Sequence, residues 1–64
     1  MKISDFRDIT LDGTIVLTKW DEETEREVYL WVGVFIPSEY DDMEVKFIYP
    51  TSFDGQNAIC IEVE

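Results

Sequence analysis

Residues 28–36 restrict the fold more than any other part of the chain, because nearly every position in this stretch is apolar. In a β-strand, alternate side chains point to opposite faces of the sheet. One face of this strand then carries aliphatic residues, namely Val28, Leu30, Val32, Val34 and Ile36. The other face carries the aromatic residues Tyr29, Trp31 and Phe35. Both faces of such a strand need a covering layer.

The remaining residues predict one helix and three further strands. Ser4 is a candidate N-cap for a short helix over residues 4–11, and Gly13 is its candidate C-terminal cap. The alternative for this segment is a β-hairpin around residues 12–13. β-Branched and aromatic residues predict strands at 14–20, 27–36, 44–49 and 58–63, with Pro37 and Pro50 ending the second and third. We therefore expect one domain, residues 1–64, with an α+β fold: a short N-terminal helix followed by a four-stranded antiparallel meander.

Such a small chain has few ways to stabilise itself. Its 64 residues include one cysteine and no histidine, so an internal disulfide and the usual zinc ligand sets are absent. A short helix covers one face of the sheet only, and we therefore expect a homodimer that buries Tyr29, Trp31 and Phe35 at its interface. Two alternatives stay open. Either the aliphatic face makes the contact, or the sheet curls strongly and closes on itself.

Acidic residues dominate the charge. Fifteen Asp and Glu residues against five Lys and Arg give a net charge of -10, and the whole excess lies in residues 21–64. This charge opposes direct binding to nucleic acid or to anionic membranes. Nine acids form two clusters, one in the first turn (Asp21, Glu22, Glu23, Glu25 and Glu27) and one in the second connection (Glu39, Asp41, Asp42 and Glu44). In a meander these clusters lie at opposite ends of the sheet, roughly 20 to 30 Å apart.

The sequence does not indicate an enzyme, a metal site or a cofactor. Histidine, the commonest catalytic base, is absent, and Cys60 lies in an alternating apolar segment typical of a buried thiol. The three glycines are isolated and form no phosphate-binding loop, and the acids do not follow the order of a calcium loop. No stretch is typical of a signal peptide or a membrane-spanning helix. We therefore expect a cytoplasmic protein.

The order of the segments resembles a known class of proteins. Residues 1–6 (MKISDF) precede the apolar strand, and residues 44–50 (EVKFIYP) and 58–63 (AICIEV) follow it. This order is similar to that of short uncharacterised acidic proteins of bacteriophages and prophages of Gram-positive bacteria. The resemblance implies a tiny, non-catalytic protein that inhibits a host defence or nucleic-acid-handling protein, as anti-CRISPR and DNA-mimic proteins do.

Two roles fit the acidic clusters. They keep a hydrophobic sheet soluble, or they imitate a phosphate backbone and bind a basic host protein. For the second role the candidate partner-binding residues are Asp21, Glu22, Glu23, Glu25, Glu39, Tyr40, Asp41, Asp42 and Glu44. The alternatives are an oligomer that sequesters a nucleotide signal by stacking on Trp20, Trp31 or Tyr49, and a small structural or assembly protein.

Overall fold

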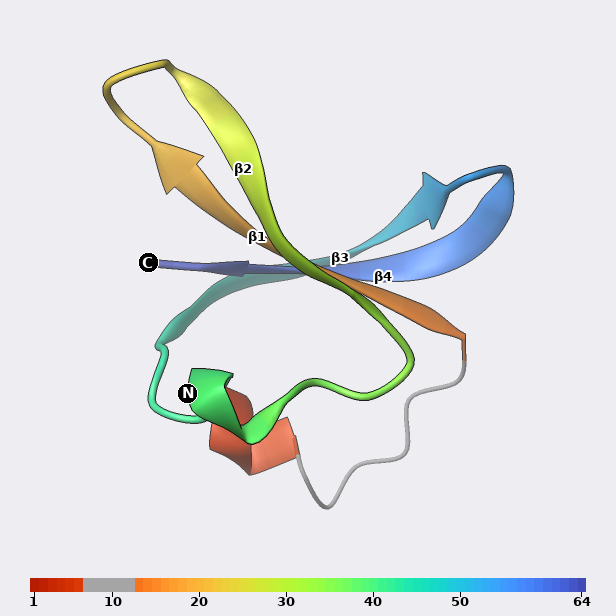
Figure 1. Cartoon of the computed structure of the whole chain (residues 1–64), viewed down its shortest axis with the longest axis horizontal. Coiled ribbons are helices and arrows are strands. Elements are labelled where there is room, and N and C mark those ends of the chain that lie inside the picture. Colours follow the sequence, from red (N-terminus) through yellow and green to blue (C-terminus); the bar gives the residue numbers. More distant parts are fainter. Residues whose placement is uncertain (7–12) are drawn as a thin grey trace.

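The computed structural model describes residues 1–6 and 13–64, and its main feature is one four-stranded sheet (Figure 1). The strands are β1 (Thr14–Asp21), β2 (Arg26–Gly33), β3 (Val45–Phe53) and β4 (Gln56–Val63). Two short 3-10 helices accompany them, η1 (Ile3–Phe6) and η2 (Ser38–Tyr40).

The strands follow the order β2-β1-β4-β3 across the sheet. β1 and β2 form one antiparallel hairpin, β3 and β4 form another, and a parallel pairing of β1 with β4 joins them. Both hairpins were predicted, whereas the α+β class and the antiparallel meander are wrong. The sheet is mixed, and the described residues contain no α-helix.

The burial of the strands explains this order. Every buried residue of the four strands lies on the central strands β1 and β4, whereas the edge strands β2 and β3 are exposed or half-buried. Pro50 was expected to end the third strand, yet β3 continues to Phe53 with Pro50 opposite Ile59. A proline without an N–H group is tolerated on an edge strand, where one side of the backbone has no partner strand. Pro50 is therefore compatible with β3 only because β3 lies at the edge.

The described N-terminal segment, residues 1–6, forms backbone hydrogen bonds with the β2–β3 connection instead of forming an α-helix of its own. The backbone N–H of Ile3 donates to the Met43 carbonyl at 3.0 Å, and that of Ser4 donates to the Asp41 carbonyl at 3.1 Å. An isolated eight-residue helix would be marginal in water. In place of its first turn the chain forms η1, and residues 7–11 of the expected helix lie outside the described residues.

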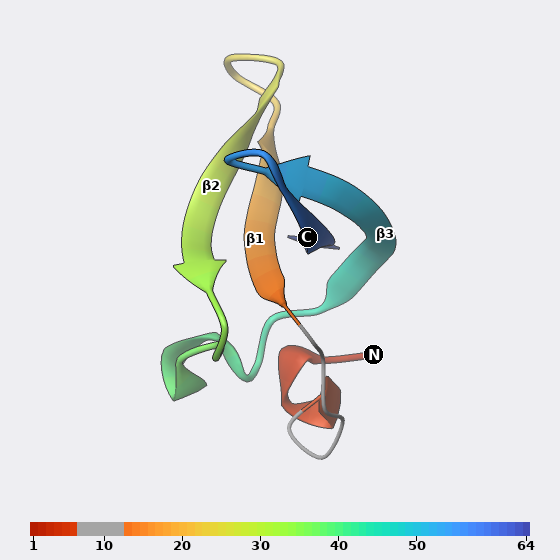
Figure 2. The ribbon, with the colours of Figure 1, turned by 90° about the vertical axis from the view of Figure 1, so that its right-hand side faces the viewer.

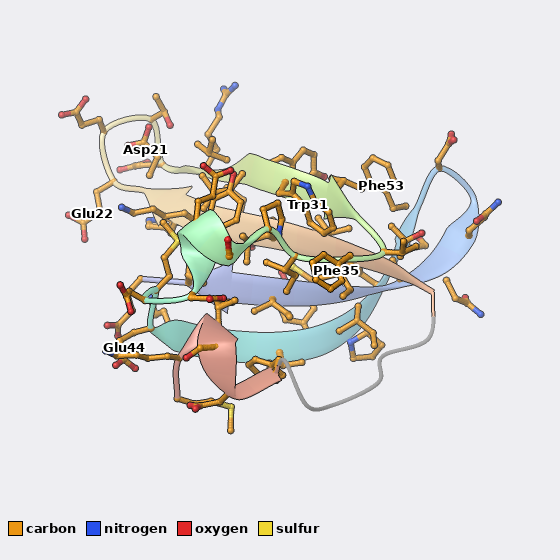
Figure 3. The ribbon with its side chains drawn as sticks, turned by 60° about the horizontal axis from the view of Figure 1, so that its bottom comes forward. Asp21, Glu22, Trp31, Phe35, Glu44 and Phe53 are labelled. Carbon is orange, nitrogen blue, oxygen red and sulfur yellow. The ribbon has the colours of Figure 1, made fainter. Side chains whose placement is uncertain are left out.

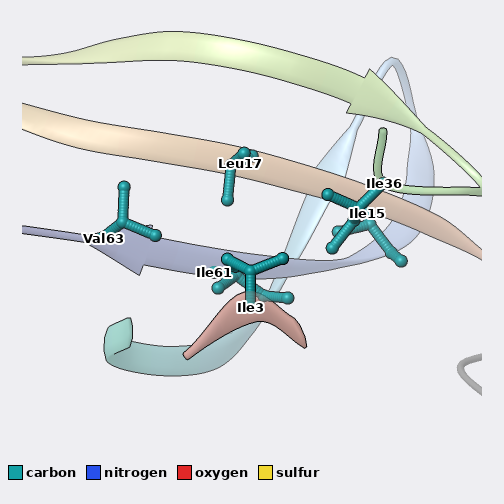
Figure 4. Close-up of a cluster of buried hydrophobic side chains, with 6 residues drawn as sticks. All are labelled: Ile3, Ile15, Leu17, Ile36, Ile61 and Val63. Atoms are coloured by element: carbon teal, nitrogen blue, oxygen red, sulfur yellow. The ribbon is translucent and has the colours of Figure 1, made fainter. Parts of the chain in front are cut away.

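One face of the sheet, which we call the core face, carries the hydrophobic core. Ile15, Leu17, Ile61 and Val63 on the central strands pack with Ile3 and Ile36 (Figure 4). The connection over residues 34–44 passes below this face from one edge strand to the other, beside η1 (Figures 1 and 2). It also supplies Tyr40, whose hydroxyl donates to the Leu30 carbonyl at 3.1 Å. The connection and η1 therefore form the covering layer of the core face.

A β-bulge in β2 breaks the alternation that the sequence predicts for this strand. Leu17 pairs with Trp31, but the next residue of β1, Thr18, pairs with Tyr29, which leaves Leu30 as the extra residue. Leu30 and Trp31 consequently both pack against the core cluster. Tyr29 lies on the other face, beside Thr18. The expectation that Tyr29, Trp31 and Phe35 share one face of the strand is therefore wrong, and β2 ends at Gly33, before Phe35.

Candidate functional site

The second side of the sheet, which we call the opposite face, is buried although neither of the two described helices, η1 and η2, covers it. Along β1 and β4, the residues that alternate with the core residues point to this face and are buried. We call them the floor of the opposite face: Val16, Thr18, Ala58, Cys60 and Glu62. Long side chains from the two edge strands supply part of the cover. This arrangement corresponds to the strongly curled sheet that the sequence left open as an alternative.

Two contacts join the edge strands above this floor. The rings of Tyr29 on β2 and Phe53 on β3 meet edge to face, with centroids 6.1 Å apart and planes at 86°. The Tyr49 hydroxyl on β3 donates to the Glu27 Oε1 atom on β2 at 3.0 Å. Since β2 and β3 are the outermost strands, these contacts span the full width of the sheet.

A cluster of polar side chains lies beneath these contacts. The Thr18 Oγ1 and Cys60 Sγ atoms are 3.5 Å apart, and hydrogen bonding with Cys60, together with burial, raises the pKa of Tyr49 far above its usual range. Glu62 is only 7% exposed. Its hydrogen bond with Glu27 raises the pKa of Glu62 above 4.5, and burial acts in the same direction. Glu62 therefore keeps its proton to a higher pH than an ordinary glutamate does.

This cluster gives little support to catalysis. A reactive thiol needs a neighbouring positive charge or base that stabilises the thiolate, but Cys60 is buried beside a tyrosine hydroxyl and a threonine hydroxyl. Within residues 1–6 and 13–64, no three Cys, Asp or Glu side chains converge in a way that could hold a metal ion. The polar cluster is best understood as a structural contact across the sheet.

The second candidate site is one end of the sheet, to which the strand order brings several acids. Lys19 on β1 and Val45 on β3 both pair with Val63 on β4. The β1–β2 turn, the start of β3 and the end of β4 therefore lie at the same end. We call this the acidic end and define it by Asp21, Glu22, Glu23, Glu25, Glu27, Glu44 and Glu64. Asp21, Glu22 and Glu44 lie along one side of the molecule (Figure 3).

This placement corrects the expected distribution of charge. A meander would put the β1–β2 turn and Glu44 at opposite ends of the sheet, whereas the parallel pairing of β1 with β4 puts them at one end. Two of these acids are held in place. Asp21 Oδ1 accepts a hydrogen bond from the Glu23 backbone N–H at 3.0 Å, and Glu44 Oε2 lies 3.2 Å from the N-terminal ammonium group. The acidic end is therefore partly pre-organised.

The other residues of the second predicted cluster belong to the connection below the core face. Glu39 and Tyr40 are in η2, and Asp41 and Asp42 follow it. Tyr40 packs against the core and donates its hydroxyl to Leu30, so it is a structural residue and a poor contact anchor. Glu39 and Asp42 are exposed, whereas Asp41 is half-buried. The structure thus joins only Glu44 of this cluster directly to the first turn.

A groove of about 570 Å³ opens at the acidic end. Its apolar lining comes from Trp20, Val28, Leu30 and Val63, and Asp21, Glu22 and Glu64 contribute carboxylates. Lys19 and Lys46 also line it and form no ion pair with another described residue. Two of the five basic residues of the chain therefore meet here. The sequence could not reveal this groove, because only the parallel pairing of β1 with β4 brings Lys19 near Lys46.

The remaining predicted contact residues are spread over the molecule. Tyr29 is 65% exposed on the opposite face, Trp31 is half-buried on the core face, and Phe35 is 70% exposed on the β2–β3 connection (Figure 3). Of the three aromatic residues considered for nucleotide stacking, only Trp20 lines the groove, while Trp31 and Tyr49 lie elsewhere. The homodimer remains a prediction, and its interface cannot contain Tyr29, Trp31 and Phe35 on one flat surface.

Two further observations bear on the class of the protein. The helices of the described segments are too short and too polar to cross a membrane. No protein-family model, no curated protein and no solved structure matches the chain.

Proposed function

We propose that this protein is a non-catalytic, acidic binding protein whose acidic end occupies a basic surface of a partner. The partner class that fits best is a host protein that handles nucleic acid or acts in defence, and the protein would inhibit it as phage-type inhibitors and DNA mimics do. A basic nucleic-acid site is complementary to closely spaced carboxylates, because the same lysines and arginines that contact phosphates can contact Asp and Glu.

One observation carries this proposal, namely the parallel pairing of β1 with β4. It gathers acids from the β1–β2 turn, from the start of β3 and from the end of β4 at one end of a sheet. Carboxylates fixed on a sheet lose less conformational freedom on binding than carboxylates on a disordered tail.

Trp20 adds a candidate anchor at the same place. Its side chain is 44% exposed, and it directly precedes Asp21 and Glu22 in the chain. Tryptophan is enriched at the energetic centres of protein interfaces, and its ring attracts the guanidinium and ammonium groups of a basic partner. The proposed contact surface therefore combines an aromatic ring with surrounding carboxylates.

The experiment starts with affinity capture of the partner from the bacterial host. The captured protein is then tested for DNA or RNA binding, with this protein added as competitor at several salt concentrations. We expect displacement of the nucleic acid, weaker at high salt because salt screens exposed charges. Glu22→Gln should weaken the competition. Asp54→Asn, in the exposed β3–β4 turn, removes the same charge away from the acidic end and should have little effect.

Two results would contradict the proposal. One is a partner without a basic surface, and the other is an affinity that does not change between low and high salt. Equal losses in Glu22→Gln and Asp54→Asn would mean that total charge matters and that the acidic end is no specific site.

The groove supports a second candidate function, the sequestration of a small aromatic anion such as a nucleotide signal. Trp20 could stack on a base, while Lys19 and Lys46 could neutralise phosphate. The neighbouring carboxylates of Asp21, Glu22 and Glu64 oppose such a ligand, which ranks this function second. Cyclic nucleotides would raise the melting temperature if they bind. Trp20→Ala should abolish that rise, and no rise with any cyclic nucleotide would refute this second function.

A further inference from the structure

The groove at the acidic end lies beyond the layer that covers the core face. Lys19 pairs with Val28 on β2 and with Val63 on β4, and the alternation of β1 puts it on the same face as Leu17. Every residue that lines the groove belongs to one of the four strands or directly follows one, so η1 and the β2–β3 connection contribute nothing to the lining. The groove is therefore the end of the core face that the covering layer leaves open.

Apolar side chains reach the surface in this groove. Val28 is 42% exposed and Leu30 is half-buried. Leu30 also packs against the core cluster, so the apolar surface of the groove continues the hydrophobic core. Its volume of about 570 Å³ lies within the range of ligand pockets, about 300 to 1,000 Å³. The groove can therefore hold a large apolar side chain of another molecule.

The charges around the groove indicate which kind of molecule fits. Three carboxylates and two ammonium groups line it, from Asp21, Glu22, Glu64, Lys19 and Lys46. The ammonium group of Lys46 already has an attractive contact, since it lies 5.6 Å from the centre of the Phe47 ring. The four other acids of the acidic end add further negative charge, and Arg26 adds one positive charge. These surroundings favour a basic molecule and oppose a second copy of this chain, which would bring its own acidic end.

We propose that the groove receives a large apolar side chain from a basic segment of the partner, with arginine or lysine on both sides of that residue. This inference rests on the proposed function, because it assumes that a basic partner binds the acidic end. The apolar side chain packs against Val28 and Leu30, while the flanking basic residues contact the carboxylates of Asp21 and Glu22. Arginine and lysine can lay their apolar stems along the groove while their charged ends stay in water. The groove thus adds selectivity for an apolar residue to a contact made by charge.

The test uses the whole protein with ¹³C-labelled methyl groups and short synthetic peptides with blocked termini. The peptides are Arg-Arg-Leu-Arg-Arg, Arg-Arg-Ser-Arg-Arg and Glu-Glu-Leu-Glu-Glu. We expect the basic leucine peptide to shift the methyl resonances of Val28 and Leu30 and to bind roughly tenfold more tightly than the serine peptide, because it buries an apolar side chain. Both affinities should fall at high salt, but their ratio should not, since salt screens charges and leaves apolar burial in place.

The possible results separate this inference from the proposed function. Equal affinities of the two basic peptides, without methyl shifts at Val28 and Leu30, would overturn the inference and leave the proposed function intact. If neither basic peptide binds, the inference fails and the competition experiment with nucleic acid decides the proposed function alone. The inference also fails if the acidic peptide binds equally well, if a cyclic nucleotide causes the same methyl shifts, or if dilution of the protein alone causes them, which would indicate a second copy in the groove.

A matched pair of variants tests the groove itself. Val28→Ser and Val34→Ser both change an exposed valine, but Val34 lies on the β2–β3 connection, outside the groove. Val28→Ser should lose most of the preference for leucine and keep its affinity for the serine peptide, whereas Val34→Ser should bind both peptides as the unmodified protein does. Circular dichroism checks the folding of both variants, and if Val28→Ser does not fold, the peptide comparison on the unmodified protein decides. Equal preferences for leucine in the two folded variants would overturn the inference.

Discussion

The two faces of the sheet are covered in different ways. On the core face, η1 and the β2–β3 connection place Ile3 and Ile36 over the central strands. On the opposite face, the cover comes from side chains of the edge strands themselves, above a floor of buried residues on β1 and β4. A chain of 64 residues has enough non-sheet segments for one layer only. The second face is buried by curvature.

The difference predicts two kinds of sensitivity. Hydrophobic burial on the core face is non-directional and does not depend on protonation. The opposite face relies on a carboxyl pair, a tyrosine hydroxyl and one pair of rings, whose contribution depends on geometry and on pH. Substitutions and pH changes directed at one face at a time can therefore test whether the two faces are stabilised by different interactions.

The largest loss of folding stability is expected when a side chain in the core face is truncated. Leu17 is fully buried at the centre of the cluster, so Leu17→Ala removes a packed side chain and leaves a cavity. Such changes cost about 2 to 5 kcal/mol, which is much of the stability of a small domain. Urea unfolding followed by circular dichroism measures the loss. Cys60→Ala, at a buried position of the opposite face, should cost clearly less, and equal losses would remove the distinction between the faces.

A smaller loss of folding stability is expected from a substitution at Gly33, the last residue of β2. A Cβ atom added at Gly33 would lie 2.6 Å from the ring of Trp31, too close for a normal contact. Gly33→Ala must therefore displace the indole from the core face, which we expect to cost about 1 to 3 kcal/mol. Unfolding measurements give the cost, and the tryptophan emission should move to longer wavelength. The matched change Gly55→Ala, in the β3–β4 turn, meets no atom within 4 Å but is strained by its φ of 78°, so it should destabilise without changing the emission.

Both hairpins were predictable, because a polar turn over residues 21–25 and another over residues 54–57 separate β-rich segments. Their arrangement was not. Residues 28–36 are the most apolar stretch, which suggested a strand that needs cover on both faces, yet β2 is an edge strand. Pro50 is the one sequence signal that the third strand lies at an edge, but a proline is equally typical of the end of a strand.

The candidate site was predictable only in part, for the same reason. The acids of the first turn are evident from the sequence, and the structure keeps them exposed. Their proximity to Glu44 and Glu64 depends on a parallel pairing of strands far apart in the sequence, which no local pattern encodes. The hydrogen bond from Tyr49 to Glu27 depends in addition on the curl of the sheet. A bulge at Leu30, rather than composition, puts Tyr29 and Trp31 on different faces.

Self-association tests which face remains available for a partner. If the expected homodimer forms, the opposite face is the better candidate, because Tyr29 and Phe47 are exposed there while the core face is already covered. Tyr29→Ser should then weaken the dimer by roughly tenfold or more, since burial of a large apolar side chain contributes about 1.5 kcal/mol or more. Phe35→Ser, on the connection below the core face, should leave it intact. Light scattering at tens of micromolar decides, and a monomer at that concentration contradicts the homodimer.

The smallest effect is expected from pH, because Glu27 is exposed and water screens its repulsion with Glu62. The pKa of Glu62 is raised in the folded protein above the ordinary value of 4.5, so the folded state binds this proton more tightly than the unfolded state. The contribution to stability is therefore fully present below pH 4.5 and is lost as the pH rises through the raised pKa. The general repulsion among the acids changes over the same range, so the informative quantity is the difference between two proteins. Urea unfolding at several pH values should give a steeper fall for the unmodified protein than for Glu62→Gln, whereas Glu64→Gln should follow the unmodified protein. Parallel curves for the unmodified protein and Glu62→Gln would mean that the opposite face is as insensitive to protonation as the core face.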